Sequence, residues 1–225
     1  IAFHDSDDYC TTDRIDLSVR AMTRLPDDYI GVYGTVLVYN DVAEVNYDRM
    51  VAHSLPRPSQ YPLSGDLSAA TLIKNILNFS TFLVRKTALV EAGLFDEDLR
   101  QNEDWDICLR LTRQGCIGFV PEPLILLPTP LDPVINDARV SRSVWQGARS
   151  FVRITGKLRH AGVDGPELSP HYASAARYLL RVNHPRFARR FLRAALTLRA
   201  WQPRLWAHYL LSFAPGLHAR MRKKR

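Results

Sequence analysis

The hydrophobic pattern of the first part of the chain switches between the spacing of strands and that of helices. Residues 1–4 form an apolar run that ends in acidic residues, which predicts a buried parallel strand whose carboxyl end opens into a ligand crevice. Residues 13–24 carry apolar positions among charges and predict an amphipathic helix ending near Pro26. Residues 30–39 are mostly β-branched and aromatic, and they predict a second strand.

Further elements are predicted up to a Pro-rich link. In chain order they are a long surface loop at 40–66, a helix at 67–77, a strand at 79–84 leading into a short helix that stops at Gly93, a helix at 103–111, one or two short strands at 116–127 and the link at 128–133. The helix at 103–111 has one apolar side, on which we expect Trp105 to be a core anchor. We expect Arg110 to pair weakly with Asp106 on its surface.

The last part of the chain has a helical pattern. Pro185 and Pro203 each precede an apolar run of helical period, as suits the first turn of a helix. Strands and helices in alternation, followed by helices alone, predict an α/β domain over residues 1–133 and an all-helical appendage over residues 134–225.

Charge divides the chain at nearly the same point. Residues 1–138 hold 11 Lys and Arg against 21 Asp and Glu, a net charge of −10, whereas residues 139–225 hold 19 against 2, a net charge of +17. The acidic part is compatible with metal-assisted catalysis, and the basic part suits an anionic surface. Residues 186–199 alternate arginines with apolar residues, so this helix can lie on an anionic membrane. The alternative is a solvated bundle whose arginines cover the outside.

Composition excludes several classes of protein. A hydrophobic content of 46% indicates a globular chain. The three cysteines form neither a disulfide framework nor a close-spaced metal site. No apolar stretch approaches the roughly 20 residues of a spanning helix. No nucleic-acid-binding signature is present, so nucleic acid is not an expected partner. The chain opens with Ile in what looks like the middle of a strand, and we expect it to be truncated at the N-terminus.

The acidic residues near the start are the first candidates for chemistry. Asp5 and Asp7 are two positions apart, so in an extended segment they project to one side and can converge on one hard divalent cation. Such a cation would neutralise the phosphates of a nucleoside diphosphate, which bare carboxylates would repel. The alternative is a turn in which Asp and Ser satisfy free backbone amides.

Four segments in a fixed order carry a resemblance to a known family. They are Ile-Ala-Phe-His-Asp-Ser-Asp-Asp at 1–8, Phe-Ser-Thr-Phe-Leu-Val-Arg-Lys at 79–86, Gly-Leu-Phe-Asp-Glu-Asp-Leu at 93–99 and Glu-Asp-Trp-Asp-Ile-Cys-Leu-Arg-Leu at 103–111. Together they resemble the second half of a family 2 glycosyltransferase of the GT-A fold, over residues 1–127. The resemblance implies a GT-A-type, Rossmann-like mixed sheet that is incomplete at the N-terminus.

The resemblance also implies roles for individual residues. Asp5 and Asp7 match the DxD motif of the family, so Asp7 would coordinate Mg²⁺ or Mn²⁺, and Asp5 would contact the donor ribose or assist the metal. Asp8 is an adjacent donor-binding candidate. Glu103 and Asp104 match the position of the catalytic base, for which Asp104 is preferred. The alternative for this pair is helix capping, and a helix dipole there is expected to lower the pKa of the base.

Two nearby positions depart from the family pattern, and two others are supporting candidates. Leu94 stands where the family often has a second glycine. His4 replaces an apolar residue, and it is a minor candidate for a metal ligand. Phe95 and Asp96 are expected to shape the acceptor side through packing and turn hydrogen bonds, as supporting residues.

The implied activity is inverting, metal-dependent transfer of a sugar from a nucleotide-sugar donor to an acceptor hydroxyl. The implied setting is bacterial polysaccharide or glycolipid biosynthesis, with a sugar or lipid-linked acceptor, in the cytoplasm or at the inner face of the cell membrane. The alternative is a non-catalytic interaction module, in which a degenerate transferase core presents the basic helices to a membrane or a partner.

Overall fold

The computed structural model describes residues 1–6, 8–39, 62–128 and 143–213. Two compact units divide the chain. The first comprises residues 1–96 and 104–137, and the second residues 97–103 and 138–225. The predicted boundary between residues 133 and 134 lies outside the described residues.

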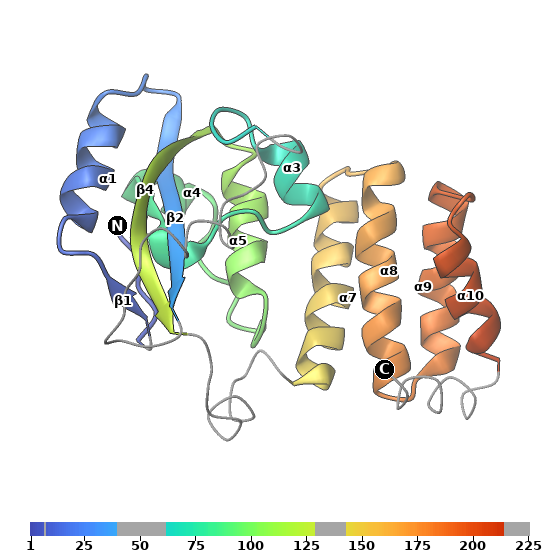
Figure 1. Ribbon diagram of the computed structural model, residues 1–225. Coiled ribbons are helices and arrows are strands. Elements are labelled where there is room, and N and C mark those ends of the chain that lie inside the picture. Colours follow the sequence, from blue (N-terminus) through green and yellow to red (C-terminus); the bar gives the residue numbers. More distant parts are fainter. Residues whose placement is uncertain (7, 40–61, 129–142, 214–225) are drawn as a thin grey trace. The chain divides into compact units, whose positions relative to one another are not determined.

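A four-stranded mixed sheet is the centre of the first unit (Figure 1). Its strands are β1 (Tyr9–Cys10), β2 (Tyr29–Tyr39), β3 (Leu83–Val84) and β4 (Cys116–Pro128), in the order β1-β4-β2-β3. The long strands β2 and β4 pair in parallel, whereas β1 and β3 are short antiparallel edges. This mixed sheet with flanking helices confirms the predicted α/β class, and it is consistent with a GT-A-like domain.

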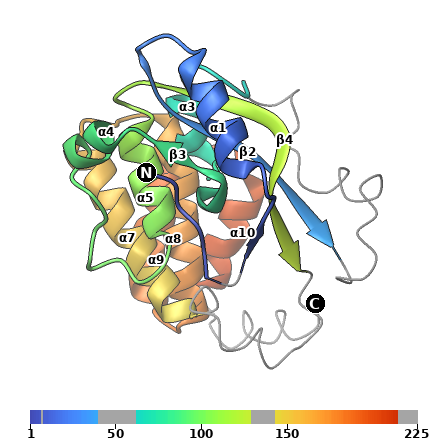
Figure 2. The ribbon, with the colours of Figure 1, turned by 90° about the vertical axis from the view of Figure 1, so that its left-hand side faces the viewer.

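Helices cover both faces of the sheet (Figures 1 and 2). Because side chains alternate along a strand, neighbouring residues of β2 enter different cores. Val32 packs with residues of α1 (Arg14–Thr23) on one face. Tyr33 packs on the other face with residues of α4 (Lys86–Glu91) and α5 (Glu103–Leu111). The core that contains Tyr33 therefore holds α5, the helix that carries the predicted catalytic base.

The opening residues do not form the buried parallel strand predicted for residues 1–4. Ala2 makes a single antiparallel bridge to Leu83 of β3, and Ile1 is 48% exposed. Backbone bonds extend this pairing, since the Phe3 N–H donates to the Phe82 carbonyl oxygen at 3.1 Å. The segment therefore lies at the edge of the sheet, where Ile1, Ala2 and His4 are exposed and Phe3 is partly buried, so its apolar residues did not indicate a buried strand.

The two later strand predictions differ from the structure in length. Residues 79–84 were predicted as a strand, but Phe79–Thr81 is a 3₁₀ turn and only β3 follows it. Residues 116–127 were predicted as one or two short strands, but β4 is a single strand. Its register against β2 shifts between Gly34 and Thr35, where Val120 and Pro123 are their respective partners. A bulge of this kind accommodates proline, which cannot donate to the ladder.

Two successive residues of left-handed backbone follow the C-cap of helix α4. Gly93 has φ +83° and Leu94 has φ +59°. Glycine adopts this conformation without strain, whereas a Cβ atom makes it unfavourable. The left-handed backbone at Leu94 explains why a glycine is frequent at this position in the family. In this chain a leucine adopts the same conformation under strain. The nearby helix α3 (Ser68–Ile73) is shorter than the helix predicted at 67–77.

Helices make up the described part of the second unit from residue 143 onward. They are α7 (Val144–His160), a 3₁₀ turn (Pro166–Leu168), α8 (Ser169–Arg181), α9 (Pro185–Leu198) and α10 (Pro203–Leu211). Both prolines predicted to start helices do so. Successive helices pack through a core that includes Ala176, Leu192 and Leu205. In the described ranges, no helix combines the length and the apolar character needed to cross a bilayer.

Candidate active site

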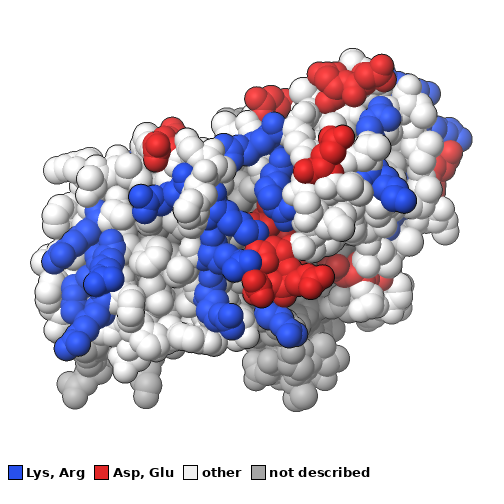
Figure 3. All heavy atoms as spheres, turned by 180° about the vertical axis from the view of Figure 1, so that it is seen from behind, with Lys and Arg blue, Asp and Glu red and all other residues white. Residues whose placement is uncertain are grey.

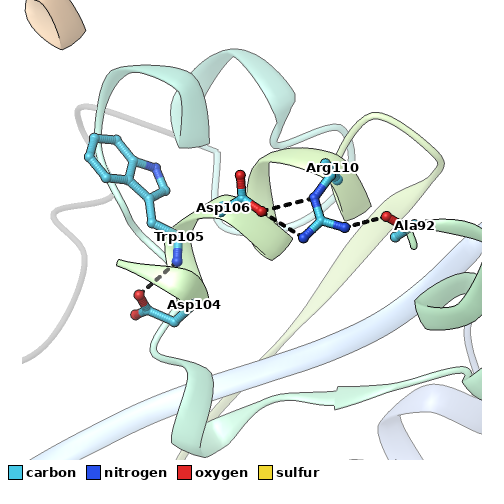
Figure 4. Close-up of polar contacts among 5 residues, drawn as sticks. All are labelled: Ala92, Asp104, Trp105, Asp106 and Arg110. Atoms are coloured by element: carbon cyan, nitrogen blue, oxygen red, sulfur yellow. Dashed lines mark hydrogen bonds and ion pairs between the residues drawn. The ribbon is translucent and has the colours of Figure 1, made fainter. Parts of the chain in front are cut away.

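Asp104 lies in the first turn of α5, where the local backbone is firmly held (Figure 4). The Asp104 Oδ1 accepts a hydrogen bond of 2.7 Å from the Trp105 N–H. Trp105 is 8% exposed, and its Nε1–H donates to the Thr71 carbonyl oxygen at 2.8 Å. Trp105 is therefore the core anchor that the sequence predicted. The predicted capping role of Asp104 is also present, because its carboxylate satisfies an amide at the helix start.

A second contact holds the other carboxylate oxygen. The Asn75 Nδ2 donates to the Asp104 Oδ2 at 3.0 Å from the segment that follows α3. The amide oxygen of Asn75 is buried and meets no hydrogen-bond partner among the described residues. A carboxylate has about four acceptor sites, so two hydrogen bonds leave it able to accept a proton.

Burial raises the pKa of the Asp104 carboxyl above its ordinary value of 3.8. Loss of hydration is the largest cause, and the hydrogen bonds from Trp105 and Asn75 oppose it by stabilising the charged form. The negative charge of Asp5 raises the pKa of Asp104 further. The expectation that the helix dipole would lower this pKa is wrong in its net direction, because desolvation outweighs the favourable amides. A raised pKa makes the carboxylate a better proton acceptor.

A buried ion pair fixes the rest of α5. Asp106 is 2% exposed, and its Oδ2 accepts hydrogen bonds from the Arg110 Nε at 3.1 Å and the Arg110 Nη2 at 2.6 Å. The Arg110 Nη1 also donates to the Ala92 carbonyl oxygen at the end of α4 (Figure 4). The pairing was predicted, but its placement on the surface was wrong. Arg110 therefore links α5 to the end of α4, and removing one partner of the pair would leave the other charge uncompensated.

The acidic turn near the start contributes Asp5 and Asp8. The Asp8 N–H donates to the Asp5 carbonyl oxygen at 3.1 Å, which closes a turn. Asp5 is exposed, and its charge acts on Asp104 although 99 positions separate them in the sequence. Asp7, the preferred metal ligand, lies outside the described residues. Two of the predicted carboxylates, Asp5 and Asp104, are thus brought into electrostatic contact.

Aromatic packing brings the acidic turn to this position. Phe3 has its ring centroid 4.3 Å from that of Phe79 and 5.6 Å from that of Phe95. Phe79 also contacts Phe82 and Phe95, at 5.7 and 5.5 Å. Such pairs contribute about 0.5–1.5 kcal/mol each beyond the area that they bury. Phe95 is therefore a packing residue of the site, with its ring half-exposed.

Arg14 supports the same turn from α1. It is 4% exposed, donates to the Phe3 carbonyl oxygen through Nη2, and places its Nη1 3.4 Å from the His4 Nδ1. Burial is the main cause that lowers the pKa of Arg14, while the nearby Asp8 acts to raise it. His4 therefore faces a cation, which disfavours its predicted minor role as a metal ligand.

The donor chemistry of the turn fits a hard divalent cation. Asp5 and Asp8 offer carboxylate oxygens, which Mg²⁺ and Mn²⁺ prefer. Within the described ranges, no group of three or more His, Cys, Asp or Glu side chains is arranged to hold a metal ion. Asp7 is outside those ranges. Among the described residues, the turn thus offers two carboxylates, Asp5 and Asp8.

Glu103 is the first residue of α5, and it is half-buried. The residue before it, Asn102, has φ +59°, a left-handed conformation that asparagine tolerates better than most residues. This turn breaks the chain direction just before the helix. It sets the position from which Glu103 and Asp104 enter the first turn.

Two residues of the site were not found from the sequence. Asn75 lies 29 positions from Asp104, and no local pattern connects the two. Arg14 was treated as one of the charges of an amphipathic helix. The sequence carried no signal for its burial: the structure buries Arg14 and Ser18 at helical spacing, whereas the apolar Ile15 is 51% exposed.

Comparison with known families gives one match. Residues 1–161 match the glycosyltransferase-like family 2. The match includes the mixed sheet, α5 and both carboxylate segments, so the class defined by fold and site is that of a glycosyltransferase. The chain belongs to glycosyltransferase family 2. Searches of curated proteins and of solved structures returned no match.

Two aspartates of one helix give a stability test with opposite expected signs. The pKa of Asp104 is raised in the folded state, so the folded protein binds this proton more tightly than the unfolded chain. Stability therefore declines as the pH rises from the unfolded value of 3.8 through the raised folded value. Asp104→Asn removes this cost, and the variant is expected to be more stable than the parent at pH 7 and not at pH 3. Urea unfolding at both pH values measures the difference.

Asp106→Asn is the matched control on the same helix. It leaves Arg110 without its charged partner, and we expect a loss of about 1–3 kcal/mol at pH 7. Destabilisation of similar size by Asp104→Asn at pH 7 would contradict the account of Asp104. In Asp104→Asn, the introduced amide can donate to the amide oxygen of Asn75, which has no partner among the described residues. We therefore expect no unsatisfied hydrogen-bonding group from this substitution.

Proposed function

We propose that this chain performs the chemical step of an inverting sugar transfer. The acceptor oxygen attacks the anomeric carbon of a nucleotide sugar and forms a new C–O bond. The bond from that carbon to the diphosphate oxygen breaks, and its electron pair leaves with the nucleoside diphosphate. Asp104 takes the proton of the acceptor hydroxyl. No covalent enzyme intermediate is required, because attack and departure occur on opposite faces of the sugar.

The observation that carries this proposal is the environment of Asp104. Its carboxylate is held by two amides, is partly removed from water, has a raised pKa and lies within the field of Asp5. A carboxylate that only caps a helix needs neither the burial, nor the raised pKa, nor the nearby charge of Asp5. A general base needs a fixed position and an elevated pKa together, since both make proton transfer efficient.

The proposal includes a divalent cation at the acidic turn. When bound, Mg²⁺ or Mn²⁺ would stabilise the negative charge that develops on the departing diphosphate. Asp5 and Asp7 would hold the ion, and Asp5 or Asp8 would meet the nucleotide. Arg14 fixes the main chain of this turn through Phe3 and so acts as a positioning residue.

The donor would be a nucleotide sugar, and the acceptor a sugar or a lipid-linked sugar. The proposed setting is polysaccharide or glycolipid biosynthesis in bacteria. A lipid-linked acceptor would require the enzyme to work at the inner face of the cell membrane. The basic helices of the second unit support this setting, because cytoplasmic lipid surfaces are anionic.

The base is tested by comparing neighbours in α5. Asp104→Asn keeps the shape of the side chain but removes the proton acceptor, and we expect kcat to fall by about 10²–10⁴-fold. Glu103→Gln is expected to retain most of the activity. The measurement is release of nucleoside diphosphate from a panel of nucleotide sugars in the presence of Mn²⁺.

Asp16→Asn is the control, since Asp16 is exposed on α1 and pairs with Arg20. Turnover by Asp104→Asn at the rate of this control would remove Asp104 from the mechanism. If turnover were instead lost only when the basic helices of the second unit are removed, the alternative of a non-catalytic interaction module would be favoured.

Metal dependence is tested by chelation. We expect EDTA to abolish diphosphate release and Mn²⁺ or Mg²⁺ to restore it, because the carboxylates alone repel the donor phosphates. Asp5→Asn should raise the metal concentration that gives half of the maximal rate. Full activity after exhaustive chelation, with metal content checked by mass spectrometry, would refute the metal requirement.

Asn75 gives a test in which the pH profile moves. Its hydrogen bond stabilises the charged carboxylate, so Asn75→Ala is expected to raise the pKa of Asp104 further. The acidic limb of kcat/KM should shift to higher pH, with the largest loss of rate at acidic pH. A loss that is equal at every pH would mean that Asn75 acts only on folding or binding.

A further inference from the structure

Helix α10 displays apolar side chains outward. Within this helix only Leu205 is buried. Trp206, Leu210 and Phe213 are 46%, 65% and 59% exposed, and their spacing of four and three residues places them on one side. Tyr209 lies between them, with its ring edge-to-face to those of Trp206 and Phe213 at 6.0 and 5.4 Å. Folding of the described unit therefore leaves this row of side chains in water.

Arginines of α9 flank this row. The Arg189 Nη1 donates to the Ser212 carbonyl oxygen at 2.8 Å, and its guanidinium carbon lies 4.6 Å from the centre of the Phe213 ring. The Arg193 Nε donates to the Tyr209 hydroxyl at 2.8 Å, and the guanidinium lies 5.7 Å from that ring. We call this surface the aromatic–arginine ridge: Arg189, Arg193, Trp206, Tyr209, Leu210 and Phe213.

The sequence that contains the ridge is strongly basic. After Glu167 the sequence contains 13 Lys and Arg and no Asp or Glu. Figure 3 shows arginine side chains gathered over the end of the bundle that carries α9 and α10. A helix surface that is merely solvated usually intersperses both signs of charge. An uncompensated positive field attracts an anionic partner.

We propose that the aromatic–arginine ridge binds the headgroup region of an anionic lipid bilayer. Trp206, Leu210 and Phe213 would enter the boundary between headgroups and acyl chains, and Arg189 and Arg193 would pair with lipid phosphates. Aromatic rings with a polar edge favour this depth, and helices with such a composition lie in the interface. The binding requires no sugar transfer, so it stands or falls independently of the proposed activity.

The apolar members of the ridge favour lipid over nucleic acid. Stacking on bases would use Trp206 or Tyr209, but Leu210 offers nothing to a base or a phosphate. In a bilayer the same exposed leucine is removed from water, which is favourable. Trp201, 92% exposed in the link before α10, adds a second interfacial side chain of the same kind.

Vesicle binding by the whole chain tests the ridge. Sedimentation with large vesicles of phosphatidylglycerol and phosphatidylcholine is expected to remove the protein from solution, and pure phosphatidylcholine is expected not to. Arg189→Gln with Arg193→Gln should lower the partition coefficient about 30-fold, at about fivefold (about 1 kcal/mol) per arginine near an anionic surface. Leu210→Ser should lower it as well, and it breaks none of the described hydrogen bonds.

Matched controls separate the ridge from general charge and apolarity. Ile15→Ser removes an apolar residue of α1 that is 51% exposed, against 65% for Leu210, and Arg20→Gln removes an exposed arginine. Basic residues at 220–225 remain in every variant. Partitioning of the ridge variants equal to that of the controls would overturn the proposal. A second result would also overturn it. If duplex DNA bound the parent protein but not Leu210→Ser, and displaced the parent from vesicles, the ridge would be assigned to nucleic acid.

Discussion

The partial burial of one carboxylate is the constraint on which the candidate site depends. Asp104 is removed from water far enough for desolvation to raise its pKa, although Trp105 and Asn75 both stabilise its charge. Full burial without partners would keep the acid protonated near neutral pH, and full exposure would leave it a weak base. The two hydrogen bonds keep the carboxylate between these limits, and they also orient it.

The remainder of the first unit serves this placement through few contacts. Trp105 fastens the start of α5 to the end of α3, and the pair of Asp106 and Arg110 fastens its middle to the end of α4. Packing among phenylalanines brings the acidic turn beside the helix. Since each contact is buried or half-buried, thermal motion of α5 would disturb several of them at once, which favours a site with a single geometry.

The sequence predicted what depends on local patterns. Helix α1, strand β2, helix α5 and the helices begun by Pro185 and Pro203 were all found, because periodicity and caps are local signals. The site was predicted only in part: Asp104 and Asp5 do interact, but the assignment rested on resemblance. The Asn75 contact and the direction of the Asp104 pKa shift were not predicted, because both depend on which distant segments exclude water. The edge position of residues 1–4 was missed because an apolar run does not reveal its neighbours.

The arginines of α9 show how a chain tolerates one sign of charge. Clustered like charges repel one another and destabilise the folded state. Arg189 and Arg193 reduce that cost locally by donating to a carbonyl and a hydroxyl oxygen and by lying over aromatic faces. These contacts hold the guanidinium groups but leave their positive charge unneutralised. The proposed contact with an anionic bilayer would supply countercharge to these arginines, whereas an ion pair within the bundle would cancel their charge and remove that attraction.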